Sequence, residues 1–249
     1  MRRRMLGSLG GWKNPYQTFD NALIFMADAE WNVGLFKHSN EKRIVDLVSG
    51  IEATVPESYS FDKKSITNIG STSSITFRTG VYHSGEVAVE ACSCLLSKPT
   101  AGNNFSGGQT FKRVSVGLWR RPVSDGCCGI IPCSFPSNGK VVYYGFPGMS
   151  RAREEADTEV FGVERTRLLN SAIPNNGIII SAYINGKLIV GTNTMTYTEA
   201  YTPSSNVTFG TYGSSSGMRF RSMRAYSRHL TDDEAKRNYE IDKERFGLQ

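Results

Sequence analysis

FRSMRAYSRHLTDDEAKRNYEIDKERFG, residues 220–247, predicts a strand that turns directly into a capped helix. Thr231 followed three residues later by Glu234 is a capping box, in which each side chain satisfies a free backbone N–H at the helix start. Gly247 is the expected stop at the other end. Before the helix, apolar residues alternate with basic and aromatic ones at the two-residue period of a strand. The predicted unit is a strand, a tight turn and a helix.

The rest of the chain is typical of an all-β protein. It has 249 residues, with 25 glycines and 11% aromatic residues, and β-sandwiches of this length commonly form one domain. Residues 84–96 and 111–121 alternate apolar and polar side chains, which indicates strands with one buried and one open face. Asn185 and Gly186 lie between two apolar runs and predict a type I′ hairpin turn, which needs positive φ at both central residues.

The charge pattern limits the classes of partner that we expect this chain to bind. The formal net charge is +6, but Lys and Arg are spread along the chain without a nucleic-acid motif, so we expect no nucleic-acid partner. The basic residues Arg2, Arg3 and Arg4 resemble the start of a signal peptide, yet no apolar run follows them. No stretch has the length of a transmembrane helix. We expect no membrane partner, a basic N-terminal arm over residues 1–19 and one domain over residues 20–249.

Five cysteines, an odd number with two adjacent in the chain, indicate mostly reduced thiols. Their spacing lacks the paired pattern of a zinc site. Calcium is an open alternative, because Asp28, Glu30 and Asn32 at alternate positions could supply oxygen ligands. The other interpretation of those three residues is a plain polar loop. We therefore expect no cofactor, with calcium as the alternative.

Three segments carry a resemblance to a known family. Residues 224–239 have the pattern R-x-Y-x-R-x-L-T-x-x-E followed by N-Y, which resembles the ending of laminin-G-like domains in the concanavalin A-like lectin/glucanase superfamily. Residues 46–50 are similar to the family's W-x-D-L-S-G turn, although Val48 is inserted and the tryptophan is missing. The hairpin at residues 183–187, Y-I-N-G-K, also resembles this family. The resemblance implies a two-sheet antiparallel jelly-roll sandwich with a short C-terminal helix packed against its edge.

One motif raises the question of catalysis. Glu155, Asp157 and Glu159 match the E-x-D-x-E strand of retaining β-glucanases, whose fold belongs to the same superfamily. That resemblance implies Glu155 as nucleophile, Glu159 as acid/base and Asp157 as their helper, on one face of a strand. The many charged residues around them favour a solvated edge strand or loop instead. We expect a protein that is not an enzyme, with a glycoside hydrolase acting on a β-glucan as the alternative.

Aromatic side chains are the candidate carbohydrate-binding residues. Trp119 and Tyr183 are predicted on the open faces of their strands, and Trp31 and Tyr212 in loops. A sugar is held by aromatic faces and polar groups in a shallow site. Burial of these aromatics against a second sheet or a neighbouring subunit is the other explanation.

The setting is implied by a further resemblance. Single laminin-G-like domains with a short basic start resemble structural proteins of bacteriophages. The resemblance implies a non-enzymatic virion decoration or fibre-type protein, made in the host cytoplasm, that forms a homo-oligomer and binds host or mucus glycans. Arg2, Arg3 and Arg4 would attach it to other virion proteins, the alternative being a disordered terminus.

Overall fold

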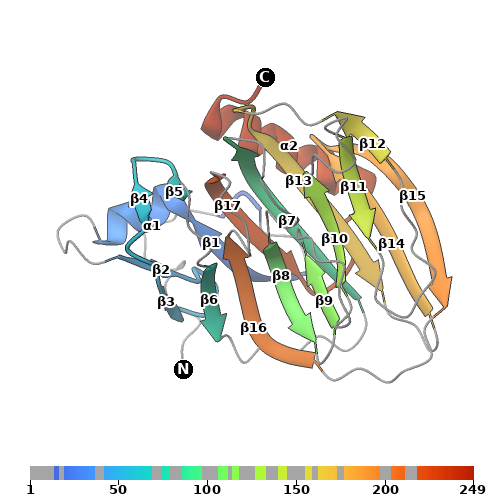
Figure 1. Ribbon diagram of the computed structural model, residues 1–249, viewed down its shortest axis with the longest axis horizontal. Helices are drawn as coiled ribbons and strands as arrows, with labels where there is room; N and C mark the ends of the chain where they lie inside the picture. The colour runs from blue at the N-terminus through green and yellow to red at the C-terminus, as the bar shows by residue number, and fades with distance from the viewer. Residues whose placement is uncertain are drawn as a thin grey trace.

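Two β-sheets stack face to face, and a C-terminal helix lies on the outer side of one of them (Figure 1). This arrangement is seen in a computed structural model, which describes residues 14–16, 20–36, 42–68, 74–78, 86–96, 106–111, 114–117, 127–132, 140–144, 155–158, 162–172, 177–196, 203–210 and 218–249. Over these residues the predicted all-β sandwich with one short C-terminal helix is confirmed.

The first sheet has the strand order β15-β14-β13-β7-β17-β5-β4, with β1 also paired to β17. Its strands are β1 (Leu23–Asp28), β4 (Tyr59–Phe61), β5 (Ile66–Asn68), β7 (Glu86–Leu95), β13 (Arg165–Ala172), β14 (Gly177–Ile184), β15 (Lys187–Thr196) and β17 (Met218–Tyr226). β17, the final strand, therefore lies between β7 on one side and β1 and β5 on the other.

The second sheet has the order β12-β11-β10-β9-β8-β16-β6. Its strands are β6 (Ser74–Arg78), β8 (Ser106–Phe111), β9 (Val114–Gly117), β10 (Cys127–Pro132), β11 (Lys140–Tyr144), β12 (Glu155–Thr158) and β16 (Pro203–Gly210). Pairing is antiparallel except between β9 and β10, as far as the described strands go. A small separate sheet pairs β2 (Arg43–Val45) with β3 (Glu52–Thr54), and the helices are α1 (Ala29–Phe36) and α2 (Asp232–Phe246).

Apolar side chains from both sheets meet in the space between them. Phe25 of β1 packs edge to face on Phe77 of β6, with ring centroids 5.0 Å apart. On β17, Phe220 and Met223 are both buried, although they are three residues apart. A β-bulge at Arg221 shifts the register against β7 and accounts for this spacing. The bulge keeps the apolar residues facing inward and directs Arg221 to the outer face.

The outer face of the first sheet, which the sequence predicts to be open, is covered. Ala88 and Glu90 of β7 are fully buried, and so are Arg224 and Tyr226 of β17. α2 lies over them and adds Ala235 to the apolar cluster on this face. A two-residue period identifies the two faces of a strand, but it does not tell which face a distant helix will cover.

The hairpin between β14 and β15 has the predicted geometry. Asn185 has φ 51° and Gly186 has φ 70°, as a type I′ turn requires. The Asn185 side chain accepts a hydrogen bond from the Thr166 amide at 3.0 Å. A Cβ on Gly186 would lie 2.8 Å from Cα of Lys236, so α2 packs directly on the turn.

The turn at residues 46–50 is built around the buried carboxylate of Asp46. One carboxylate oxygen accepts the amides of Met26 (2.9 Å) and Val48 (3.1 Å), and the other accepts the amide and hydroxyl of Ser49. Gly50, at φ 76°, donates its amide to the Asp46 carbonyl at 2.7 Å. Burial raises the pKa of Asp46, and these hydrogen bonds oppose the rise. The turn therefore fixes β1 in place.

Two elements near the N-terminus are not predicted by the sequence. Residues 29–36 form α1 instead of an irregular stretch. Asp28 begins this helix by accepting the Trp31 amide at 3.1 Å, in the manner of a cap. Tyr16 falls in the segment expected to be an arm, yet its side chain is fully buried.

Candidate functional site

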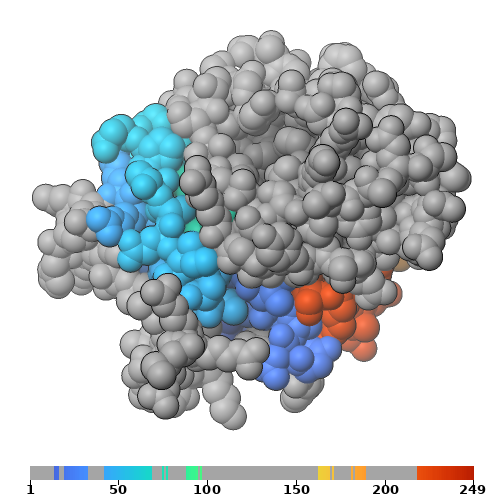
Figure 2. Space-filling model, turned by 90° about the horizontal axis from the view of Figure 1, so that it is seen from below, coloured from blue at the N-terminus to red at the C-terminus, as the bar shows by residue number. Residues whose placement is uncertain are grey.

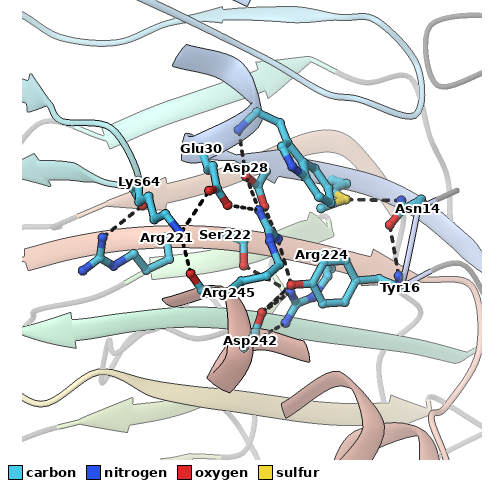
Figure 3. A network of polar contacts seen from close by, with 12 residues as sticks. Asn14, Tyr16, Asp28, Glu30, Lys64, Arg221, Ser222, Arg224, Asp242 and Arg245 are labelled. Carbon is cyan, nitrogen blue, oxygen red and sulfur yellow. Dashed lines mark hydrogen bonds and ion pairs between the residues drawn. The ribbon is translucent and has the colours of Figure 1, made fainter. Parts of the chain in front are cut away.

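Beneath α2, the outer face of the first sheet carries a buried network of charges (Figure 3). At its centre Arg224 forms a two-point ion pair with Asp242 of α2, with Nη1 to Oδ1 at 2.8 Å and Nη2 to Oδ2 at 2.6 Å. Asp242 also accepts the hydroxyls of Tyr16 and Thr166, each at 2.7 Å. Four donors therefore satisfy this carboxylate, which offsets the cost of burying it.

Glu90 is the second acid in contact with Arg224. Its Oε2 accepts Nε of Arg224 at 3.0 Å and the side-chain amide of Asn238 at 2.9 Å. Burial raises the pKa of Glu90 to about 7, with Arg224 opposing the rise and Asp242 adding to it. Within the described residues, Oε1 of Glu90 and Oδ1 of Asn238 have no hydrogen-bond partner. Burial therefore favours the protonated form of Glu90, and Arg224 favours its ionised form.

Arg245, in the last turn of α2, ties this helix to α1. It donates to both oxygens of Asp28, at 2.9 and 3.0 Å, and to Glu30 at 2.9 Å. Its guanidinium lies 3.9 Å from the centre of the Trp31 ring, within the range of a cation–π contact. Lys64 completes the group with an ion pair to Glu30 at 3.1 Å.

The N-terminal end of α2 is fixed by the same closing motif. Thr231 and Glu234 form the predicted capping box, which is confirmed. Arg228 donates to both oxygens of Glu234 at 2.8 Å, and these bonds lower the pKa of Glu234 to about 2. Arg228 also pairs with Asp20, and Figure 2 shows residues near the two ends of the chain side by side at the surface.

These contacts assign a structural role to residues 224–239. The polar side chains of this motif join α2 to the sheet. Arg224, Arg228 and Arg245 donate hydrogen bonds to acidic residues of the same chain. The apolar member of the motif, Leu230, is buried in the cluster beneath the helix. The network positions α2 on the sheet.

A second cluster lies on the same face, beside the last residue of α2. The bulge brings Arg219 and Arg221 to one carboxylate, that of Glu164. Arg221 reaches both oxygens at 3.0 Å, and Nη1 of Arg219 lies 3.1 Å from Oε1. Burial raises the pKa of the neighbouring Cys94 to about 11. The raised pKa favours the thiol form of Cys94 at neutral pH over the reactive thiolate.

Sequence reasoning did not identify this cluster. Its signal is the spacing of the arginines in β17, which stand two and then three residues apart at positions 219, 221 and 224. A change of spacing from two to three within a strand is the mark of a bulge, and bulges redirect side chains.

The sequence predicts Tyr183 on an open face of the sheet, but the structure places it on a covered face. Its side chain is 5% exposed and belongs to the apolar cluster beneath α2. Its hydroxyl donates to Asp232, in the first turn of α2, at 2.6 Å. Burial, and then the contact with Asp232, raises the pKa of Tyr183 to about 12. The prediction of an exposed ring fails because α2 covers it.

Trp31 lies in α1 instead of a loop, and Arg245 stacks on its ring. Trp119, Tyr212 and the three arginines at positions 2–4 lie outside the described residues. Carbohydrate binding by the aromatics and attachment by the basic start therefore stay predictions.

β12 contains the first part of the acidic motif and lies at the edge of the second sheet. It pairs only with β11 among the described strands, with Glu155 opposite Val142 and Thr158 opposite Lys140. The directions of the Glu155 and Asp157 side chains, and all of Glu159, lie outside the described part of the chain. The other side of β12 faces no further strand in the described part of the second sheet.

The oxygens of the alternative calcium site have other partners. Asp28 and Glu30 are paired with Arg245, and Oδ1 of Asn32 accepts the Val45 amide at 2.6 Å. In the described residues, no three or more His, Cys, Asp or Glu side chains form a group that could hold a metal ion. Neither described helix has the length and apolar character needed to cross a membrane.

Comparison with known proteins identifies the fold. No protein-family model matches the sequence, and no curated protein matches it. Among solved structures, Trypanosoma rangeli sialidase superposes with a TM-score of 0.61 at 10% identity, over 90% of this chain and 33% of the sialidase. The same enzyme in complex with sialic acid gives 0.59 at 11% identity, over 90% and 33%. The botulinum neurotoxin serotype D ligand binding domain in complex with N-acetylneuraminic acid gives 0.59 at 13% identity, over 92% and 53%.

The likeness at this identity establishes a β-sandwich fold, and the chain spans about one third of the sialidases' length. It corrects the predicted function. The sequence predicts a non-enzymatic virion protein, whereas the similar structures include sialidases, which are enzymes. They favour the alternative, a glycoside hydrolase, over that prediction, and they give the bacteriophage setting no support.

Proposed function

We propose that this protein is a carbohydrate-active member of the concanavalin A-like superfamily whose sandwich binds a glycan. The observation that carries the proposal is the shared sandwich of two differently named proteins, each solved with the same sugar acid. The sandwich of this chain superposes on both over about nine tenths of its length. Fold alone does not determine function, so the proposal depends on binding data.

Hydrolysis of a glycosidic bond is the second candidate function, and the likeness to sialidases favours it. The candidate residues are those of the acidic motif that begins in β12. In a retaining mechanism Glu155 attacks the anomeric carbon while Glu159 protonates the leaving oxygen. Glu159 then takes a proton from water, which releases the sugar from Glu155. The substrate class is a β-glucan or a related polymer.

Two assays on the purified chain test these functions. The first measures binding to a panel of neutral and acidic glycans, and we expect selective binding to at least one class. The second measures sugar release from β-glucans and from sialylated polymers. Glu155→Gln should abolish release, whereas the control Glu154→Gln, one position away, should leave it within about twofold. If the unaltered protein neither binds a glycan nor releases sugar, the proposal is refuted.

A further inference from the structure

A row of polar side chains crosses four strands at the end of the outer face. In the first sheet Ser60 pairs with Thr67, Thr67 with Arg219, and Arg219 with Cys94. Directly paired residues in antiparallel strands project to the same side of a sheet. The flanking residue Phe220 is buried between the sheets, so the row points outward. Ser60 is exposed and Thr67 is half-buried.

Arg219 is oriented by an ion pair that uses only one of its guanidinium nitrogens in the described part of the chain. Its side chain is 33% exposed, and within the described residues it makes one contact, from Nη1 to Glu164. Arg221 occupies both oxygens of that carboxylate and is only 15% exposed. Glu164 therefore orients Arg219, while Nε and Nη2 of Arg219 have no partner among the described residues.

The nearby acid Asp62 does not occupy these donors. Its oxygens accept the amide of Lys64 at 2.7 Å and the hydroxyl of Ser65 at 2.8 Å. The pKa of Asp62 is lowered mainly by the Lys64 amide, with smaller contributions from Arg221 and Arg219. Asp62 thus belongs to its own turn, and Arg219 is the partly exposed side chain of this row whose guanidinium keeps N–H groups without a partner in the described part of the chain.

A sugar acid fits the chemistry of the row. A carboxylate accepts two parallel N–H bonds from one edge of a guanidinium, the strongest geometry available to arginine. The backbones of Thr67 and Ser60 lie one and two strand spacings from that of Arg219, about 5 and 10 Å. A monosaccharide whose carboxylate is bound by Arg219 would lie along the row, toward the hydroxyl-bearing residues of β5 and β4.

We propose that this row binds a carboxylate-bearing sugar, with Arg219 receiving the carboxylate and the Thr67 and Ser60 hydroxyls contacting the ring. The inference rests on the proposed glycan binding and specifies its ligand class. Glu164 and Arg221 act as positioning residues, since they fix the guanidinium of Arg219 without touching the sugar.

Calorimetric titration tests the inference with two probes. One is the methyl α-glycoside of N-acetylneuraminic acid, and the other is its methyl ester, which lacks the negative charge. The unaltered protein should bind the acid at least about tenfold more tightly than the ester. Arg219→Ala should weaken binding of the acid about 10- to 100-fold, the range for hydrogen bonds to a charged group, and should leave binding of the ester within about threefold.

A matched control and a second variant keep the outcome clear. Arg43→Ala removes an exposed arginine that is paired with Glu52 on the small sheet, and it should bind the acid as the unaltered protein does. Thr67→Val keeps the shape of the side chain and should weaken both probes. If Arg219→Ala fails to fold, two results still test the inference: the effect of Thr67→Val on binding, and the ratio of the affinities of the unaltered protein for the acid and for the ester.

The outcomes separate the two proposals. Equal binding of acid and ester, or full binding by Arg219→Ala, overturns the inference about this row. Binding of neutral glycans alone also overturns it, while the proposed glycan binding survives. If no glycan binds, both proposals fall.

Discussion

Replacing Asp242 with asparagine is expected to destabilise the protein more than any exposed change on α2. The carboxylate accepts four hydrogen bonds beneath the helix, two of them from the fully buried Arg224. Asparagine keeps the size but removes the charge and one acceptor. Arg224 then retains Glu90 as its only acidic contact among the described residues, and one guanidinium edge loses its acceptor.

The magnitude follows from the burial of the pair. Breaking a buried ion pair by removing one partner costs about 3–5 kcal/mol, because the remaining charge stays in a site that water does not reach. Domains are stable by about 5–15 kcal/mol in total. The variant should therefore lose a large share of its stability and unfold at clearly lower urea.

Urea unfolding followed by circular dichroism measures this loss. Glu240→Gln, an exposed acid-to-amide change on the same helix, is the control and should stay within about 0.5 kcal/mol of the unaltered protein. The triple variant Arg224→Met, Asp242→Leu and Glu90→Gln should be more stable than Asp242→Asn, because it removes all three charges that meet at Arg224 and leaves none of them unpaired. A loss below about 1 kcal/mol for Asp242→Asn would refute the reasoning.

Three further expectations follow from other contacts. The folded-state pKa of Glu90 is raised from 4.5 to about 7. The stabilisation that comes from this raised pKa is therefore fully present below pH 4.5 and is lost as the pH rises through 7. The free energy of unfolding should fall between these pH values, and Glu90→Gln should flatten this dependence on pH. Gly186→Ala should lower the melting temperature more than Gly162→Ala, because both have positive φ but only the first would place a Cβ 2.8 Å from the backbone of α2; equal shifts would disprove the close approach. Thr231→Ala should cost about 1 kcal/mol in chemical unfolding through loss of the helix cap, and an unchanged midpoint would contradict the capping role.

Local signals predicted the local elements well. The capping box at the start of α2 and the positive-φ pair at Asn185 and Gly186 are both present. Each depends on residues close together in the chain, whose chemistry is visible in the sequence. The alternation in residues 84–96 also identified a strand, because the two-residue period is a property of the strand itself.

The candidate sites depend on contacts between distant segments, and these were not predictable. Arg224 meets Asp242 only because α2 folds back over the sheet, and the same return buries Tyr183. Arg219 and Glu164 are brought together by pairing of β7 with both β13 and β17. A single sequence carries the charges of these residues but not the register that places them side by side.

The central position of β17 sets the order in which the chain can fold. β17 joins β1 and β5 to β7, so the first sheet cannot be completed until residues 218–226 have left the ribosome. Before that point β1 and β7 present unpaired edges to other chains. Contacts over more than 200 residues, such as Asp20 with Arg228, also close late and slow folding. We expect the unfinished chain to need protection by chaperones during synthesis, and the C-terminal segment to act as the final step that seals the sheet.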